Sequence, residues 1–153
     1  MKIQCEDHRN AAKIIPLDVQ NEVKQAIPSG PAAKSATTAR TALLDMLRNV
    51  HGWSDKVTLC PDAKISIPAK KDEFALCIQT GNMGRFYADL LKLEFLYKRN
   101  LIQAALYIVP EKDLAKTWSE NVANFERFTN EVRIFSSILH CPLLILSIPK
   151  SRS

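Results

Sequence analysis

The 153-residue sequence has little of what marks several broad classes of protein. With only 4 glycines, 8 prolines and no sustained heptad repeat, it cannot be collagen, a long disordered tract or a coiled coil. Its longest apolar run, near residues 143–146, is far shorter than the ~18–20 residues of a transmembrane helix. Residues 1–4 do not open an apolar signal-peptide core. We therefore expect a cytoplasmic protein with no membrane partner.

Motifs of metal and nucleotide chemistry are also missing. The four cysteines form no CxxC pair, and the three histidines do not stand beside them at zinc-ligand spacing. The sequence holds no GxSxG elbow, P-loop, GxGxxG turn or HExxH motif. These absences argue against a serine hydrolase of that type, a P-loop NTPase, a dinucleotide-binding enzyme and a zinc protease.

The composition that is present is that of an ordinary globular domain. Hydrophobic residues make up 46% and charged residues 24%, and the length predicts a single domain over residues 1–153. Lys and Arg number 21 against 16 Asp and Glu, which gives a net charge of +5. That excess permits a nucleic-acid partner but does not require one, because phosphate binding needs the charge gathered on one face.

Residues 1–52 are predicted to be helical. One helix is expected to begin after Asp18 as its N-cap and to end at the turn residues 28–31. Ala39, Leu43 and Leu47 lie in an apolar stripe that predicts a second helix over residues 33–50. We expect residues 1–52 to form the N-terminal helices of the single domain.

Residues 56–148 alternate between strands and helices. Three short extended runs, 57–60, 64–67 and 74–79, are separated by turn residues and predict an antiparallel meander. In the third run, Phe74, Leu76 and Ile78 share one face and are expected to point to the core.

The remainder continues as helix, strand, helix and strand. These are predicted near residues 83–97, 104–109, 121–140 and 143–148. The order gives an α/β fold with a mixed sheet of about five strands flanked by helices.

One part of the sequence carries a family likeness. It is made of residues 75–79, 81–82 and 85–92, continues through 101–110, and is extended by 121–127 and 142–145. These residues resemble the type II restriction endonucleases of the Bgl and Bam type, in the PD-(D/E)xK nuclease superfamily. The likeness spans about residues 10–148, and it implies a restriction-endonuclease-like core over residues 56–148.

The resemblance implies a Mg²⁺-dependent DNA phosphodiesterase site. In such a site, carboxylates from the second and third strands hold a metal that activates water. The family pattern places an acid in the second strand and Glu-x-Gln in the third. Here Gln79 matches, Cys77 replaces the glutamate, and Ser66 stands near the expected second-strand acid. We therefore predict a catalytically silenced nuclease fold that binds DNA, with Ser66, Cys77 and Gln79 at the site positions and no cofactor.

The resemblance also implies a homodimer on double-stranded DNA, because readers of two-fold sites need that symmetry. Lys70 and Lys71, in a predicted turn, are candidate contacts with phosphates. Asn82 and Arg85, at the start of the predicted helix 83–97, are two more.

Two alternatives remain open. In the first, the protein is an active Mg²⁺-dependent double-strand endonuclease whose metal ligands have migrated to Asp62, Glu73 or Asp89. Asp89 is the best of these candidates, although it could instead form a local pair with Arg85 or Lys92. In the second, the chain is a protein-interaction module without a DNA role, since fold does not fix function.

Overall fold

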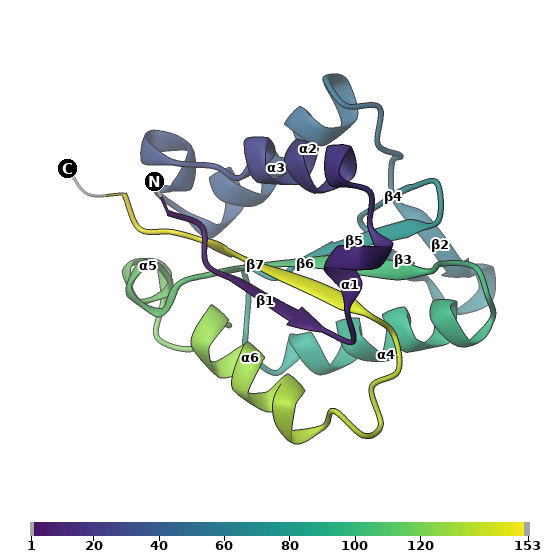
Figure 1. Cartoon of the computed structure of the whole chain (residues 1–153). Coiled ribbons are helices and arrows are strands. Elements are labelled where there is room, and N and C mark those ends of the chain that lie inside the picture. Colours follow the sequence, from purple (N-terminus) through teal and green to yellow (C-terminus); the bar gives the residue numbers. More distant parts are fainter. Residues whose placement is uncertain (1, 152–153) are drawn as a thin grey trace.

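The computed structural model describes residues 2–151 as one α/β arrangement (Figure 1). The strands are β1 (Cys5–His8), β2 (Val57–Cys60), β3 (Ile65–Ile67), β4 (Ala69–Lys71), β5 (Phe74–Ile78), β6 (Ala104–Pro110) and β7 (Leu143–Ile148). The α-helices are α1 (Ala11–Ile14), α2 (Leu17–Ala26), α3 (Ala36–Asn49), α4 (Arg85–Lys98), α5 (Lys112–Trp118) and α6 (Phe125–Ile134). Two 3₁₀ helices, η1 (Gly30–Ala33) and η2 (Pro61–Ala63), complete the described chain.

A five-stranded mixed sheet forms the middle layer, in the order β1-β7-β6-β5-β4. Strands β5, β6 and β7 are parallel, and the edge strands β1 and β4 pair antiparallel with their neighbours. Figure 1 shows α2 and α3 on one face of this sheet and α4 and α6 on the other. The predicted α/β class and the five-stranded mixed sheet are confirmed.

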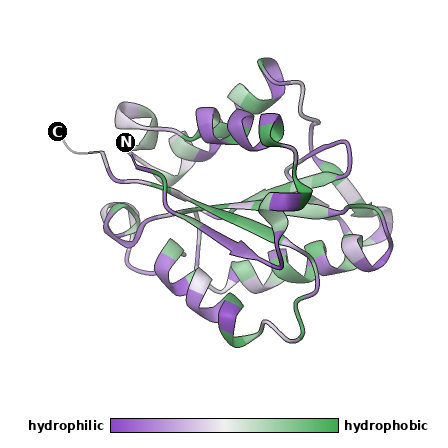
Figure 2. Ribbon diagram, viewed as in Figure 1, coloured by the Kyte–Doolittle hydropathy of each residue, from purple (hydrophilic) through white to green (hydrophobic). Residues whose placement is uncertain are grey.

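Burial on both faces follows from this three-layer arrangement. Phe74, Leu76 and Ile78 of β5 pack into the core on the α2–α3 side, as predicted, while Ala75 and Cys77 pack into a second core against α4 and α6. Apolar residues gather between the layers, and polar ones lie along the outer helix faces (Figure 2). A central parallel strand is covered by helices on both sides, so both sets of its side chains are buried.

The expected meander of strands 57–60, 64–67 and 74–79 is wrong, because these three strands do not form one sheet. Strands β2 and β3 pair only with each other, in a separate two-stranded sheet. The antiparallel partner of β5 is β4, in a segment expected to be a turn. Strand β1, at the opposite edge, was not predicted at all. Both edge strands are short and partly polar, so their sequences lack the apolar run that identifies β6 and β7.

The predicted helices are present with altered ends. Helix α3 begins at Ala36 because Ser35 forms a capping box with Thr38, while residues 30–33 form η1. Asp18 is not an N-cap but lies in the first turn of α2, which follows Pro16. Helix α6 is shorter than expected because Asn124 caps its start and Phe135 ends it. Helix α5 was not predicted. No helix within residues 2–151 is long and apolar enough to cross a membrane.

Candidate functional site

A groove of about 910 Å³ lies between α3 and α4, beside the end of β5. Its lining includes five cationic side chains, Arg40, Arg48, Lys56, Arg85 and Lys92. Within residues 2–151, Asp89 is the only carboxylate in that lining. The carboxyl ends of parallel strands are where α/β folds usually bind ligands. This groove is therefore the candidate site.

Helical spacing brings the charges to the groove from two sides. Arg40 and Arg48 are eight residues apart on α3, so they lie about two turns apart along the helix and within about a quarter turn of each other around its axis. On α4, Arg85, Asp89 and Lys92 stand at i, i+4 and i+7 and share a face. Each helix thus turns a charged stripe toward the other.

The two arginines of α3 are held by main-chain carbonyls. Arg40 Nη1 donates to the carbonyl oxygen of Ile78 at 2.9 Å, between the site positions 77 and 79. Arg48 donates to the carbonyls of Pro68 at 2.7 Å and Ser54 at 3.2 Å. A guanidinium carries five N–H donors, so a carbonyl contact of this kind leaves donors for a further acceptor.

Gln79 is a buried link between the end of β5 and α4. Its Nε2 donates to Asp89 Oδ2 at 2.8 Å, and its Oε1 accepts from the Gly81 amide at 3.0 Å. A Cβ placed on Gly81 would come within 3.2 Å of that Oε1 and within 3.4 Å of Arg85 Nη1. The glycine therefore allows the chain to turn closely around the Gln79 side chain.

Asp89 is a mostly buried carboxylate held by uncharged donors. Its Oδ2 accepts from Gln79 and from the Tyr107 hydroxyl at 2.7 Å, while Lys92 Nζ lies 4.0 Å from its Oδ1. Burial raises the pKa of Asp89, and the hydrogen bonds from Tyr107 and Gln79 oppose that rise without cancelling it. The ring of Tyr107 stacks on Phe128 with centroids 4.0 Å apart, which fixes the hydroxyl that reaches Asp89.

The predicted site residues are brought together only in part. Ser66, Gln79 and Asp89 all line the groove. Cys77 does not, because it is 1% exposed and packs in the core on the α4 side. Burial, reinforced by the nearby charge of Asp89, raises the pKa of the Cys77 thiol well above its ordinary value. Cys77 is therefore a protonated thiol rather than a nucleophile near neutral pH.

The candidate DNA contacts divide in the same way. Arg85 lines the groove, and Asn82 lines an adjoining hollow that shares Thr80 and Gly81 with it. Lys71 instead forms an ion pair with Glu22 at 2.8 Å. In the described part of the chain, neither Lys70 nor Lys71 is among the groove-lining residues.

The three acids considered as migrated metal ligands lie apart. Asp62 is in η2, Glu73 precedes β5 and bonds to Gln103, and Asp89 is on α4. Across residues 2–151, no group of three or more His, Cys, Asp and Glu side chains is placed to hold a metal ion. Mg²⁺ favours sites with oxygen ligands such as carboxylates, and the groove offers one carboxylate among five cations. The donor set does not fit the metal that the resemblance implies.

Sequence reasoning missed Arg40, Arg48, Lys56 and Tyr107. The signal for the two arginines was their eight-residue spacing on a helix whose apolar stripe was already recognised. The link from Tyr107 to Asp89 had no local signal, because it depends on β6 lying beside β5 with Tyr107 opposite Cys77.

A family model and two solved structures relate this chain to the restriction endonuclease BglII. The family model described as restriction endonuclease BglII/BglIII matches residues 3–148. A crystal structure of restriction endonuclease BglII complexed with a DNA 16-mer superposes with a TM-score of 0.86 at 15% identity, covering 99% of this chain and 79% of that one. Free BglII gives a TM-score of 0.74 at 14% identity, covering 99% and 81%. The search of curated proteins finds no match. At these identities the structural likeness establishes the fold.

Proposed function

The chain belongs to the restriction endonuclease BglII/BglIII family, and from that premise we propose that it binds double-stranded DNA through a catalytically silent nuclease site. The observation that carries this proposal is the charge of the groove at the end of β5. Five cations and a single carboxylate line the groove, which includes Ser66, one of the two positions where the resemblance expects a metal-binding acid, and lies beside β5, the strand that carries the other, Cys77.

The loss of the two acids changes the chemistry in two ways. Ser66 and Cys77 are poor ligands for Mg²⁺, which is hard and prefers oxygen donors that carry negative charge. Two fewer carboxylates also mean less repulsion of phosphate oxygens. The first change disfavours metal-dependent hydrolysis, and the second favours binding of the nucleic acid without cleavage.

DNA is the proposed partner because of where the positive charge lies. BglII is the protein seen with DNA in the related crystal structure. In this chain the support comes from the groove itself, where helices α3 and α4 hold cations opposite each other. Each phosphate neutralised by such a cation releases condensed counterions, which makes binding favourable at low salt and sensitive to added salt.

We also propose a homodimer, and helix α4 offers a face for it. Leu91 is 72% exposed and Phe95 is 40% exposed. Both border an apolar groove of about 350 Å³ whose opposite wall contains Leu59 and Ile65. Sedimentation should show a dimer for the unmodified chain and a monomer for Leu91→Arg. A monomer for both would remove the dimer from the proposal.

A single domain over residues 1–153 and a cytoplasmic location stay predictions from the sequence.

The first experiment is a plasmid assay at low salt. Supercoiled plasmid is incubated with the protein in Mg²⁺, in Mn²⁺ and in a chelator, and is then run on a gel. The expected result is retarded, uncut plasmid in all three. Cleavage that a chelator abolishes would support the active endonuclease instead. If the Gln79→Ala variant also failed to cleave, the silent-site proposal would be abandoned. Plasmid neither shifted nor cut would favour the protein-interaction module.

A restoration experiment tests the cause of the silence. Ser66→Asp with Cys77→Glu returns acids to the two positions. Because Cys77 is fully buried, the new glutamate must find room beside Asp89, so circular dichroism must first show that the variant folds. Metal-dependent nicking by a folded double variant, with none by either single variant, would support the loss of two acids as the cause.

A further inference from the structure

One side-chain cation already stands in the site where the resemblance calls for a metal. Arg40 Nη1 lies 2.9 Å from the carbonyl oxygen of Ile78, the residue between Cys77 and Gln79. Arg40, Ser66 and Gln79 also line the same groove. The guanidinium therefore stands at the end of β5, beside the strand positions where the resemblance expects acids, in a groove that Ser66 and Gln79 also line.

We infer that Arg40 replaces the divalent cation, so that the groove holds a DNA phosphodiester directly and without metal. This rests on the proposed DNA-binding function and specifies how it is carried out. A guanidinium is planar, always charged, and matches two phosphate oxygens with paired N–H donors. Among residues 2–151, the only hydrogen bond from the Arg40 side chain goes to Ile78. The remaining donors are available to a ligand.

Among residues 2–151, the single carboxylate of the groove forms no ion pair with Arg40, although the charge of Arg40 acts to lower the pKa of Asp89. Asp89 Oδ2 is taken by Gln79 and Tyr107, both uncharged, and the cation nearest its Oδ1 is Lys92. A divalent ion entering this space would meet the like charges of Arg40, Arg85 and Lys92. A phosphodiester is negatively charged, so the same three cations would attract it. The electrostatics thus favour the anion over the metal.

The shape of the charged region favours a chain of phosphates over a single free ion. The groove continues past Thr80 and Gly81 into a second hollow of about 510 Å³ that is lined by Lys34 and Asn82. The cationic lining therefore extends over two adjoining hollows, with five cations in the groove and Lys34 in the second hollow. A nucleic-acid backbone, which repeats its charge along its length, suits a charged surface of that extent.

The test measures the affinity for a labelled DNA duplex by fluorescence anisotropy. Titrations are run in chelator and in Mg²⁺ at matched ionic strength, and over a salt series. The unmodified chain should bind equally with and without Mg²⁺. Arg40→Gln should weaken binding by roughly tenfold and make the salt dependence shallower by about 0.9, the value for one phosphate contact.

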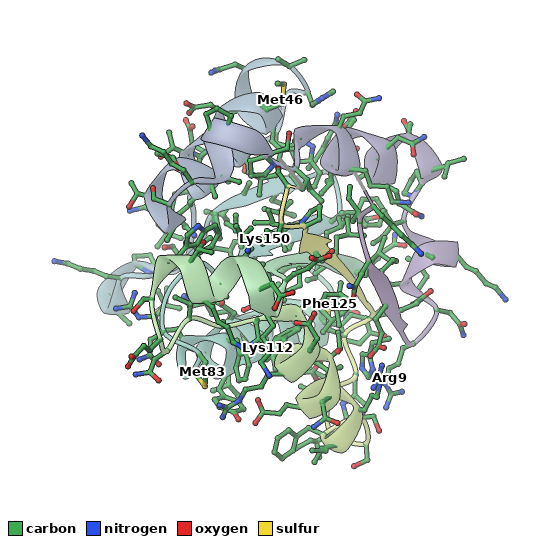
Figure 3. The ribbon with its side chains drawn as sticks, turned by 90° about the vertical axis from the view of Figure 1, so that its left-hand side faces the viewer. Arg9, Met46, Met83, Lys112, Phe125 and Lys150 are labelled. Atoms are coloured by element: carbon green, nitrogen blue, oxygen red, sulfur yellow. The ribbon has the colours of Figure 1, made fainter. Side chains whose placement is uncertain are left out.

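Arg9 offers a matched control. Like Arg40, it donates to main-chain carbonyls, those of Leu139 at 2.8 Å and Ser136 at 3.0 Å. It follows β1, at the far edge of the sheet from β5, and Figure 3 shows it on the opposite side of the molecule from Met83, which precedes α4. Arg9→Gln removes the same charge and the same kind of bond. It should change DNA affinity by less than about threefold.

The outcomes separate the inference from the proposed function. If the unmodified chain does not bind DNA, the proposed function fails and the inference fails with it. If the chain binds but Arg40→Gln behaves like Arg9→Gln, or if binding requires Mg²⁺, the inference alone is overturned. Competition by inorganic phosphate, beyond that of a salt at equal ionic strength, would assign the groove to a free anion and overturn it too.

A second measurement needs no Arg40 variant, which guards against one that fails to fold. Electron paramagnetic resonance reports free Mn²⁺, whose signal falls when the ion binds protein. The unmodified chain should not reduce the signal of free Mn²⁺. The signal should be the same with the unmodified chain as with the Asp89→Asn variant. Mn²⁺ bound by the unmodified chain and released by Asp89→Asn would place a metal in the groove and overturn the inference.

Discussion

Two carboxylates, one on α2 and one on α4, show how the same kind of group is used in opposite ways. Glu22 of α2 accepts from Lys71 Nζ at 2.8 and 2.9 Å and from Trp53 Nε1 at 3.1 Å. Burial works to raise the pKa of Glu22, but the hydrogen bonds from Lys71 and Trp53 outweigh it and lower the pKa. Burial raises the pKa of Asp89, and its uncharged partners do not reverse that effect.

The difference lies in what each acid leaves for other ligands. Glu22 closes an ion pair with Lys71, and Lys71 also donates to the His51 carbonyl at 2.7 Å. That cation is committed to the fold. Asp89 is satisfied largely by neutral groups. Within residues 2–151, Arg48 forms an ion pair with Asp55 at 3.7 Å, whereas Arg40 and Arg85 form none, so these two are available to an outside anion. The local ratio of charges, and not the net charge of +5, decides which region can bind phosphate.

The largest effect is expected from removing two groove cations that do not support the fold. Arg85 and Lys56 are exposed, and no hydrogen bond or ion pair found in residues 2–151 uses either side chain. Lys56→Gln with Arg85→Gln should weaken duplex binding on the order of 50-fold and make the salt dependence shallower by about 1.8. Anisotropy titrations over a salt series measure both.

The matched control removes two exposed lysines elsewhere, with Lys13→Gln and Lys98→Gln. Both lie outside the groove, Lys13 on α1 and Lys98 at the last position of α4. This pair carries the same loss of charge, so it should weaken binding by no more than about threefold. Equal losses in the two double variants would mean that net charge, and not the groove, controls DNA affinity.

The next effect is on stability and belongs to Glu22. Glu22→Gln leaves the partly buried Lys71 without its counter-ion, and it should cost about 1–2 kcal/mol of unfolding free energy at neutral pH. Because the folded pKa of Glu22 lies below the ordinary value of 4.5, its contribution is present above that pH and is lost as pH falls through the folded pKa. Urea unfolding at pH 7 and below pH 4.5 measures the change.

The same variant sharpens the comparison with the groove. Glu22→Gln frees a cation, but Lys71 does not line the groove in the described residues, so DNA affinity should change by less than about twofold. A large gain in affinity would show that Lys71 reaches DNA once it is released. In that case the original prediction of Lys71 as a phosphate contact would regain support.

The sequence predicted the frame of this molecule better than its charges. Strands β6 and β7 are buried on both faces and read as apolar runs, so their positions followed from composition alone. The core face of Phe74, Leu76 and Ile78 followed from alternation, and the recognised family pattern supplied the alignment of Gln79.

Partner choice was beyond local pattern. Lys71 binds Glu22 across 49 positions, and Arg40 reaches the Ile78 carbonyl across 38. A lysine in a turn and an arginine on a helix give the same local signal whether they contact solvent, an acid or a ligand. Only the packing of α2 and α3 over the sheet decides between these outcomes. For the same reason the bond from Tyr107 to Asp89 could not be foreseen.

A gain in DNA affinity, opposite in sign to the losses expected from the groove variants, is expected from Asp89→Asn. The new amide keeps an oxygen that can accept from Gln79 and Tyr107, but it removes the only carboxylate that lines the groove within residues 2–151. DNA affinity should rise about threefold at neutral pH, because the phosphates no longer meet that negative charge. Anisotropy titrations of the two proteins side by side measure this gain.

Stability should rise as well, in a window set by the pKa of Asp89. The folded pKa lies above the ordinary value of 3.8, so the favourable contribution of Asp89 is full below pH 3.8 and is lost as pH rises through the folded pKa. Asp89→Asn should thus gain stability at neutral pH and lose that advantage at acid pH, where the native carboxyl is protonated. Weaker DNA binding by Asp89→Asn in Mg²⁺, but not in chelator, would mean that the carboxylate acts through a metal. The groove would then belong to an active nuclease. Asp89 would hold a metal cation as Glu22 holds Lys71, and the difference between the two acids would disappear.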